Sequence, residues 1–254
     1  MGAFGIGTQR VEDEVLLLLR EEGLGDAGVE VIRMDADTTR GKDGHQRLLE
    51  RFDKASCAVL VGTQMIAKGL DFPEVTLVGV VNADTTLKLP DFRASERTYA
   101  LLEQVAGRAG RGERPGKVVV QTYWASHPAI LAVALHDRDV FLEDEISQRE
   151  EGGYPPYSRL SNVVVWGRHA GEVARVSQDV ASALRAEVDQ CEGWEVLGPA
   201  DCVKSRVKDR VRKHVVLKSP SDAPVGDLLG SCVNGLGKRS GTSVAIDVDA
   251  YDMM

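Results

Sequence analysis

The sequence predicts two α/β units, a parallel sheet covered by helices and then a smaller unit with one strand layer and one helix layer. Over the first half, short apolar runs alternate with helical patterns, which is typical of parallel sheets. Over the second half, the elements follow the order strand, helix, strand, strand, helix, strand. Between the halves, a charged helical stretch ends in two glycines, a tyrosine and two prolines at residues 152–156. These residue types break helices, so we expect the boundary there.

The spacing of apolar residues predicts the helices and strands of the first half. Thr8 is expected to cap a first helix whose first turn carries acidic residues, and Gly23 to Gly25 are expected to end it. The later elements are a strand at 29–34, a helix at 44–54, strands at 58–61 and 75–81, a helix at 95–104, a strand at 118–120 and a helix at 128–135. Functional residues of such sheets lie at the carboxyl ends of strands, where Thr63 and Asp84 fall.

The elements of the second half define a different layout. A charged helix at 137–151 leads into it. The elements are a strand at 160–166, a helix at 170–188, a short strand near 195–197, a basic strand pair at 204–218, a helix at 223–235 and a strand at 243–248. This order predicts a split βαβ, ferredoxin-like sandwich. The predicted domains are therefore 1–136, a connector with a proline turn at 137–158, and 159–254.

Composition limits the classes of function. The chain has 254 residues and a formal net charge of -8, so any attraction to nucleic acid must come from a local patch. The four cysteines lack Cys-x-x-Cys spacing, which argues against a zinc site and against a disulfide framework. No apolar run approaches the about 20 residues of a membrane span, and no signal peptide is visible. We expect a cytoplasmic protein with no metal site and no membrane partner.

The segment that follows the helix at 95–104 is rich in glycine and arginine. Arg108 and Arg111 are three residues apart, so they would share one face if the helix continued. Gly107 and Gly110 would each cost roughly 1 kcal/mol inside a helix, and glycine suits a helix end that a ligand approaches closely. A guanidinium binds phosphate oxygens bidentately, which favours a polyphosphate ligand. Solvated arginines at a surface helix end are the alternative.

Three segments carry a resemblance to a known family. Residues 62–73 (Gly-Thr-Gln-Met-Ile-Ala-Lys-Gly-Leu-Asp-Phe-Pro) resemble motif V of superfamily 2 helicases, and residues 104–111 (Gln-Val-Ala-Gly-Arg-Ala-Gly-Arg) resemble their motif VI. Together with residues 90–97 (Pro-Asp-Phe-Arg-Ala-Ser-Glu-Arg), the residues of these two motifs resemble the sequences of the primosomal protein N′ family of replication-restart helicases. Residues 5–12, 154–157 and 247–249 fit the same family, so the resemblance covers nearly the whole chain. It implies a second RecA-like helicase lobe followed by a C-terminal domain.

The resemblance implies roles for the residues of the two helicase motifs. Arg108 and Arg111 match arginines that neutralise charge on the γ-phosphoryl group during ATP hydrolysis. Gln104, Gly69 and Asp71 match positions that face the ATP, although Asp71 alone could also be a helix cap.

The same resemblance assigns the threonine of motif V to DNA. Thr63 matches a residue expected to touch the nucleic-acid backbone, and Lys68 could serve either ATP or DNA.

A basic stripe in the second half provides a signal that depends on spacing rather than on the resemblance. Basic residues alternate with valines between 204 and 218, and period two places alternate residues on opposite faces of a strand. A turn near Asp209 is expected to fold the stripe into a hairpin, with Lys204, Arg206, Arg210 and Arg212 on one face. Such a face suits a DNA backbone or an acidic peptide tail, and a solvated sheet face is the alternative. The family implies branched DNA and the acidic tail of single-stranded-DNA-binding protein as ligands.

Some expected motifs are missing from the sequence. It has no Gly-x-x-x-x-Gly-Lys-Ser/Thr loop for phosphates and no Asp-Glu-x-His for magnesium. In the family these belong to a first helicase lobe, expected to precede residue 1, as is a zinc-binding cysteine cluster. We therefore expect the C-terminal part of an ATP-dependent 3′-5′ DNA helicase that is inactive by itself. The alternative is a non-hydrolysing module that binds forked or single-stranded DNA, single-stranded-DNA-binding protein or other primosome proteins.

Overall fold

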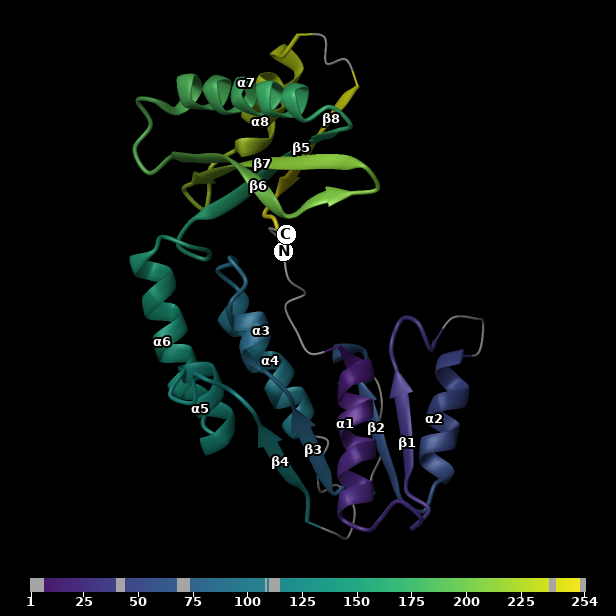
Figure 1. Cartoon of the computed structure of the whole chain (residues 1–254). Helices are drawn as coiled ribbons and strands as arrows, with labels where there is room; N and C mark the ends of the chain where they lie inside the picture. Colours follow the sequence, from purple (N-terminus) through teal and green to yellow (C-terminus); the bar gives the residue numbers. More distant parts are fainter. Residues whose placement is uncertain are drawn as a thin grey trace. The chain divides into compact units, whose positions relative to one another are not determined.

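The computed structural model describes residues 7–39, 44–67, 74–107, 109, 115–237 and 241–251 (Figure 1). The chain divides into two compact units. The N-terminal unit comprises Met1–Leu89 and Ala94–Phe141, and the C-terminal unit comprises Pro90–Arg93 and Leu142–Met254. The division after Phe141 falls inside the predicted connector. The membership of residues 90–93 in the C-terminal unit was not expected from the sequence.

The N-terminal unit alternates strands and helices, as predicted. Its strands form two parallel pairs, β1 with β2 and β3 with β4. The elements are α1 (Thr8–Glu21), β1 (Glu30–Met34), α2 (Gly44–Lys54), β2 (Ala58–Gly62), the short 3-10 helix η1 (Gln64–Ala67), β3 (Leu77–Val80), α3 (Asp84–Leu87), α4 (Ala94–Ala106), β4 (Lys117–Val120), α5 (Pro128–Leu135) and α6 (Arg138–Glu151), whose later turns belong to the C-terminal unit. The predicted parallel-sheet lobe is confirmed.

The beginning of α1 differs from the prediction. Gly7, not Thr8, is the N-cap residue, and it makes no side-chain cap bond. The hydroxyl of Thr8 instead donates a hydrogen bond to Asp35, at the end of β1, with a distance of 2.6 Å. The helix begins at Thr8, one residue earlier than a Thr8 cap predicts, so Glu12 lies beyond the first turn and that turn carries no acidic residue. The helix ends at Glu21, just before Gly23 with its φ of 72°.

Two groups of buried side chains stabilise the N-terminal unit. Ile32 and Met34 of β1 are fully buried, and both α1 and α2 pack on the β1–β2 pair. A second cluster joins the end of β3 to α4 and α5, with Ala83, Leu102, Ile130 and Val133 at its centre. The rings of Tyr99 and Phe141 stack beside it, with centroids 4.5 Å apart. These contacts fix the ends of the parallel strands, where the candidate site lies.

The C-terminal unit is a four-stranded sheet with the order β6-β7-β5-β8, and all neighbouring strands are antiparallel. Its elements are β5 (Arg159–Gly167), α7 (Ala170–Val188), β6 (Glu195–Val207), β7 (Arg210–Ser219), α8 (Val225–Gly235) and β8 (Thr242–Val248). This order and topology confirm the predicted split βαβ sandwich. Strand β6 runs on from the predicted short strand to Val207. Lys208 and Asp209, both with positive φ, form the predicted turn to β7.

One face of this sheet forms the core of the C-terminal unit. Val163, Val165, Val215 and Leu217 of the sheet are fully buried together with residues of both helices. The helix residues of this cluster include Val173, Val180 and Leu184 of α7 and Leu229 of α8. Because side chains alternate along a strand, the residues between these valines and leucines project from the opposite face.

Candidate functional site

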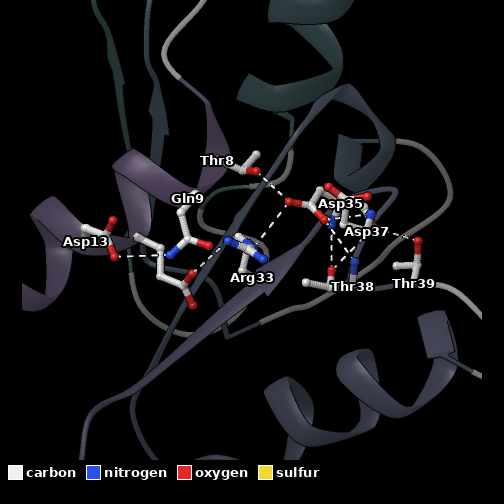
Figure 2. A network of polar contacts seen from close by, with 9 residues as sticks. Thr8, Gln9, Asp13, Arg33, Asp35, Asp37, Thr38 and Thr39 are labelled. Carbon is white, nitrogen blue, oxygen red and sulfur yellow. Dashed lines mark hydrogen bonds and ion pairs between the residues drawn. The ribbon is translucent and has the colours of Figure 1, made fainter.

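Asp35, directly after β1, is the centre of a polar network (Figure 2). Its carboxylate accepts a hydrogen bond from the Thr8 hydroxyl at 2.6 Å and from the backbone amides of Asp37 and Thr38 at 2.9 and 3.0 Å. Figure 2 shows Thr8 approaching from α1 and Thr38 from the turn after β1. The network ties the start of α1 to the carboxyl end of a sheet strand.

Hydrogen bonds, with a smaller effect of the nearby Arg33, keep the Asp35 carboxylate ionised. The hydrogen bond from Thr8, followed by that from the Thr38 amide, lowers the pKa of Asp35 from 3.8 to about 2, although partial burial opposes them. Arg33 lies 3.2 Å from Asp35 and 3.3 Å from Glu12 of α1. The donors of this network already point at the carboxylate, so its role is to hold the strand end in place.

The end of β2 carries the first residues of motif V. A side-chain Cβ on Gly62 would lie 2.5 Å from the carbonyl oxygen of Met34, on the neighbouring strand. The glycine is therefore required by the close approach of β2 to β1. Thr63 follows as an exposed residue at the carboxyl end of the strand, as predicted. Its carbonyl accepts a hydrogen bond from the amide of Ile66 at 3.1 Å.

Three predicted residues of motif V, Lys68, Gly69 and Asp71, lie outside the described residues. Their assignments to ATP and DNA stay predictions.

Asp84 joins the ends of β3 and β4. It is fully buried and accepts hydrogen bonds from the Thr122 hydroxyl at 2.5 Å and from the Tyr123 amide at 3.0 Å. Burial raises the pKa of Asp84, but these two hydrogen bonds outweigh burial and hold the pKa below its usual value. Asp84 does lie at a strand end, as predicted, but its carboxylate faces the protein and orders the loop after β4.

The ends of β2, β3 and β4 form one surface, here called the carboxyl edge and defined as residues 63–64, 82–88 and 121–124. The Gln64 side chain donates a hydrogen bond to the Thr86 hydroxyl at 3.4 Å, which connects the end of β2 to α3. The amide of Ala83 donates to the carbonyl of Gln121 at 3.0 Å, which connects the ends of β3 and β4. Gln64, the residue after Thr63, thus contacts α3, which follows the end of β3.

Motif VI begins on α4 and continues beyond it. The helix covers the predicted 95–104 and ends at Ala106. The backbone amide of Gly107 donates a hydrogen bond to the Glu103 carbonyl at 3.0 Å, which closes the last turn. Gln104 is half-buried on this helix. Arg108 and Arg111 lie outside the described residues, so their catalytic role stays a prediction.

The basic hairpin of the C-terminal unit differs in one respect from the prediction. Arg212 lies opposite Trp166 of β5, on the face away from the helices, and Arg210 is on the same face of β7. Arg206, in contrast, lies opposite Val211 and so shares the helix-side face. The prediction that Lys204, Arg206, Arg210 and Arg212 share one face is wrong for Arg206.

A register irregularity explains the difference. Between the pairs Asp201–Lys213 and Arg206–Val211, four residues of β6 (202–205) lie beside one residue of β7, Arg212. Extra residues in one strand shift its alternation relative to its partner, and Lys204 lies inside the irregular stretch.

The sheet face away from the helices therefore carries two arginines, Arg210 and Arg212, beside Trp166. We call these three residues the hairpin face. The sequence did not single out Trp166, although period two along β5 places it on this face. His214 follows Arg212 on the same side, but burial and then the nearby Arg212 lower the pKa of its ring. The histidine is therefore neutral near pH 7, and the charge of the hairpin face comes from the two arginines.

Two segments that carried the family resemblance meet within the C-terminal unit. The ring of Phe92 stacks on Tyr154, with centroids 5.1 Å apart and an interplanar angle of 1°. The guanidinium of Arg93 lies 4.2 Å from the Phe92 ring and 5.1 Å from the Tyr251 ring, and it donates a hydrogen bond to the Ala250 carbonyl at 3.1 Å. We call this group the aromatic clasp, residues 92–93, 154 and 250–251. It gives the 90–93 segment a structural role.

Within the described ranges, no helix is long and apolar enough to cross a membrane. The same ranges contain no group of three or more histidine, cysteine, aspartate or glutamate side chains that could hold a metal ion.

Comparison with known proteins assigns the two units to a class. Residues 4–113 match the family described as "Helicase conserved C-terminal domain". Residues 150–251 match the family described as "Primosomal protein N C-terminal domain". The N-terminal half of the chain is therefore similar to a helicase C-terminal domain, and the C-terminal half is similar to the C-terminal domain of a primosomal protein.

Individual relatives define the class further. The chain is 42% identical to the replication restart protein PriA of Bacillus subtilis over 99% of its length. It is 42% identical to that of Synechocystis over 86% and 38% identical to that of Treponema pallidum over 98%. These matches cover 30%, 25% and 36% of the three relatives, so the chain spans about a third of their length or less. The resemblance to the C-terminal part of PriA is thereby confirmed.

Proposed function

We propose that this chain is the C-terminal part of an ATP-dependent 3′-5′ DNA helicase that restarts replication. The observation that supports this most is the similarity to replication restart proteins over nearly the whole chain, across both units. In this proposal Arg108 and Arg111, just beyond α4, complete an ATP site whose phosphate loop and magnesium ligands lie on another lobe. Gln104, Gly69 and Asp71 face the nucleotide. The helix end at Ala106, followed by Gly107, fits this role, because a glycine allows a ligand to approach the backbone closely.

DNA binding is assigned to both units. In the N-terminal unit, Thr63 is exposed at the carboxyl edge and contacts a phosphate, with Lys68 following it in the chain. In the C-terminal unit, Arg210 and Arg212 of the hairpin face contact the backbone of forked DNA. Arg206 and Lys204 have weaker support than these two arginines, because the strand irregularity removes them from a common face.

The chain by itself is proposed not to hydrolyse ATP, since its sequence contains neither the phosphate loop nor the magnesium motif. The proposed partners are single-stranded-DNA-binding protein and other primosome proteins. The similarity to replication restart proteins also supports a cytoplasmic site of action. Because the sequence lacks these ATP-site motifs, a non-hydrolysing module that binds DNA or primosome proteins is the second candidate. Steady-state ATP hydrolysis with forked DNA, assayed with and without the missing lobe, distinguishes the two candidates.

The DNA-binding part of the proposal can be tested with matched single substitutions on the hairpin. Arg212→Gln and Arg206→Gln each remove one positive charge from the same β-hairpin, but on opposite faces of the sheet. Fluorescence anisotropy of labelled forked DNA across a salt series measures both affinity and the number of phosphate contacts. Arg212→Gln is expected to weaken binding and to make the salt dependence shallower by about one phosphate contact. Arg206→Gln is expected to change both much less. Equal effects of the two substitutions would show that the face does not matter, and the proposed site would be wrong.

A further inference from the structure

Two aromatic side chains at the end of β4 are exposed to solvent. Tyr123 is 87% exposed and Trp124 is 44% exposed, although large aromatic side chains are normally well covered. The ammonium group of Lys88, itself exposed, lies 5.7 Å from the centre of the Tyr123 ring and 5.6 Å from that of Trp124. A cation beside two accessible rings is a combination suited to a ligand that is both aromatic and anionic.

Backbone hydrogen bonds hold this pair of rings in place. The buried carboxylate of Asp84 accepts from the Tyr123 amide and from the Thr122 hydroxyl. That hydroxyl oxygen in turn accepts a hydrogen bond from the Trp124 amide at 2.9 Å. The Trp124 carbonyl accepts from the amide of His127, the N-cap of α5, at 2.9 Å. The two rings therefore stand on an ordered loop, so binding a ligand there does not require the loop to be ordered first.

The rings also lie in a place that fits a nucleic acid. They belong to the carboxyl edge, and Lys88 follows α3, whose Thr86 is hydrogen-bonded to Gln64. Thr63, the residue proposed to contact a DNA phosphate, immediately precedes Gln64 in the chain. A DNA strand that contacts Thr63 can therefore continue along the protein toward the ends of β3 and β4.

We propose that Tyr123, Trp124 and Lys88 form a binding site for single-stranded DNA, in which bases stack on the two rings and Lys88 contacts a phosphate. This inference rests on the proposed DNA-binding function of the chain. Stacking requires base faces that are free, as they are in single strands but not inside a duplex. An apolar protein surface would be a poorer occupant, because it would remove Lys88 from water without supplying a negative charge.

The test compares two oligonucleotides that differ only in their bases. Labelled oligodeoxythymidine and an abasic oligonucleotide of the same length are titrated with the full chain, so that phosphate contacts are common to both. The parent chain is expected to bind the thymidine strand more tightly than the abasic one. The double variant Tyr123→Ala/Trp124→Ala is expected to lose that preference, with a loss of about fivefold or more in affinity for the thymidine strand and little change for the abasic strand.

A matched pair of lysine substitutions provides the control. Lys88→Ala is expected to weaken the binding of both oligonucleotides, because it removes a phosphate contact. Lys117→Ala removes an exposed lysine at the opposite end of β4 and is expected to leave both affinities unchanged. Tyr123→Ala alone removes only an exposed ring and retains the hydrogen bond from the backbone amide of residue 123 to Asp84. This single variant therefore tests the site if the double variant does not fold.

The outcomes separate this inference from the proposed function. A parent chain that binds forked DNA but shows no preference for bases over abasic residues would overturn the stacking site alone. The same conclusion holds if the double variant retains the preference. A parent chain that binds no DNA of any kind would overturn the proposed DNA-binding function as well.

Discussion

The network around Asp35 makes the stability of the N-terminal unit depend on acid pH. The folded protein holds the pKa of Asp35 at about 2, compared with 3.8 for an ordinary aspartate. Because the folded-state pKa is the lower one, the stabilisation is complete above about pH 4 and is lost as the pH falls toward about 2. At about 1.4 kcal/mol per pKa unit, the difference corresponds to at most about 2.5 kcal/mol. Since 13% of the side chain is exposed, solvent screening reduces the expected contribution to about 1–2 kcal/mol.

Two substitutions test this value. Asp35→Asn is expected to lower the free energy of unfolding of the N-terminal unit by about 1–2 kcal/mol near pH 7 and to change it little near pH 2. Thr8→Val removes the donor hydroxyl with little change in shape and is expected to cost about as much, because it leaves a carboxylate without its shortest hydrogen bond. Asp13→Asn is the control, since this exposed carboxylate accepts a hydrogen bond from Gln9 of the same helix and not from the groups that bind Asp35 (Figure 2).

The measurement must report on the N-terminal unit alone, because two units need not unfold together. Amide hydrogen exchange of α1 and β1, followed at several pH values, meets this requirement. A stabilising role of Asp35 is refuted if these amides exchange as slowly in the Asp35→Asn variant as in the parent near pH 7. The expected pH dependence is refuted if the loss in stability is the same near pH 2 as near pH 7.

Three further substitutions address other parts of the molecule. Gly62→Ala places a Cβ 2.5 Å from the Met34 carbonyl oxygen, so it is expected to destabilise the N-terminal unit by about 1–3 kcal/mol in urea unfolding, and an unchanged midpoint would contradict the close strand approach. Phe92→Ala removes the ring between Tyr154 and Arg93 and is expected to lower the melting temperature of the C-terminal unit, while an effect confined to the N-terminal unit would argue against the aromatic clasp. In a longer protein that includes the first helicase lobe, Arg111→Ala is expected to lower kcat for ATP hydrolysis by about 10³ or more without lowering the melting temperature, and a matching loss of stability would make Arg111 structural.

Element type and position could be predicted well where a helix buries one regular face. The predicted ranges 44–54, 128–135 and 170–188 coincide with α2, α5 and α7. In α7 the buried residues, among them Val173, Val180 and Leu184, recur at helical spacing, so the apolar pattern contains the information directly. The strand order of the C-terminal unit also followed from the order of its elements, because a split βαβ arrangement has few alternatives.

Contacts between distant residues could not be predicted in the same way. Thr8 has a residue type that favours helix caps, but its hydroxyl bonds Asp35, 27 positions away. Arg93 donates a hydrogen bond to the carbonyl of Ala250, 157 positions away, and no local sequence pattern indicates that partner. The face of Arg206 depends on an irregularity of strand pairing, which period-two reasoning assumes to be absent. Of the candidate site, Thr63 and Asp84 were correctly placed at strand ends, whereas the exposed pair Tyr123 and Trp124 was not singled out.

The aromatic clasp restricts how this chain can be divided or recombined. The chain leaves the N-terminal unit at Leu89, contributes four residues to the C-terminal unit and returns at Ala94. A cut after Phe141 would separate Phe92 and Arg93 from Tyr154 and would expose an apolar ring on each fragment. A chimaera that exchanges the C-terminal region between relatives would need to carry the 90–93 tetrapeptide with it, as an island within foreign sequence. The two units therefore cannot be exchanged independently by joining two continuous segments of sequence.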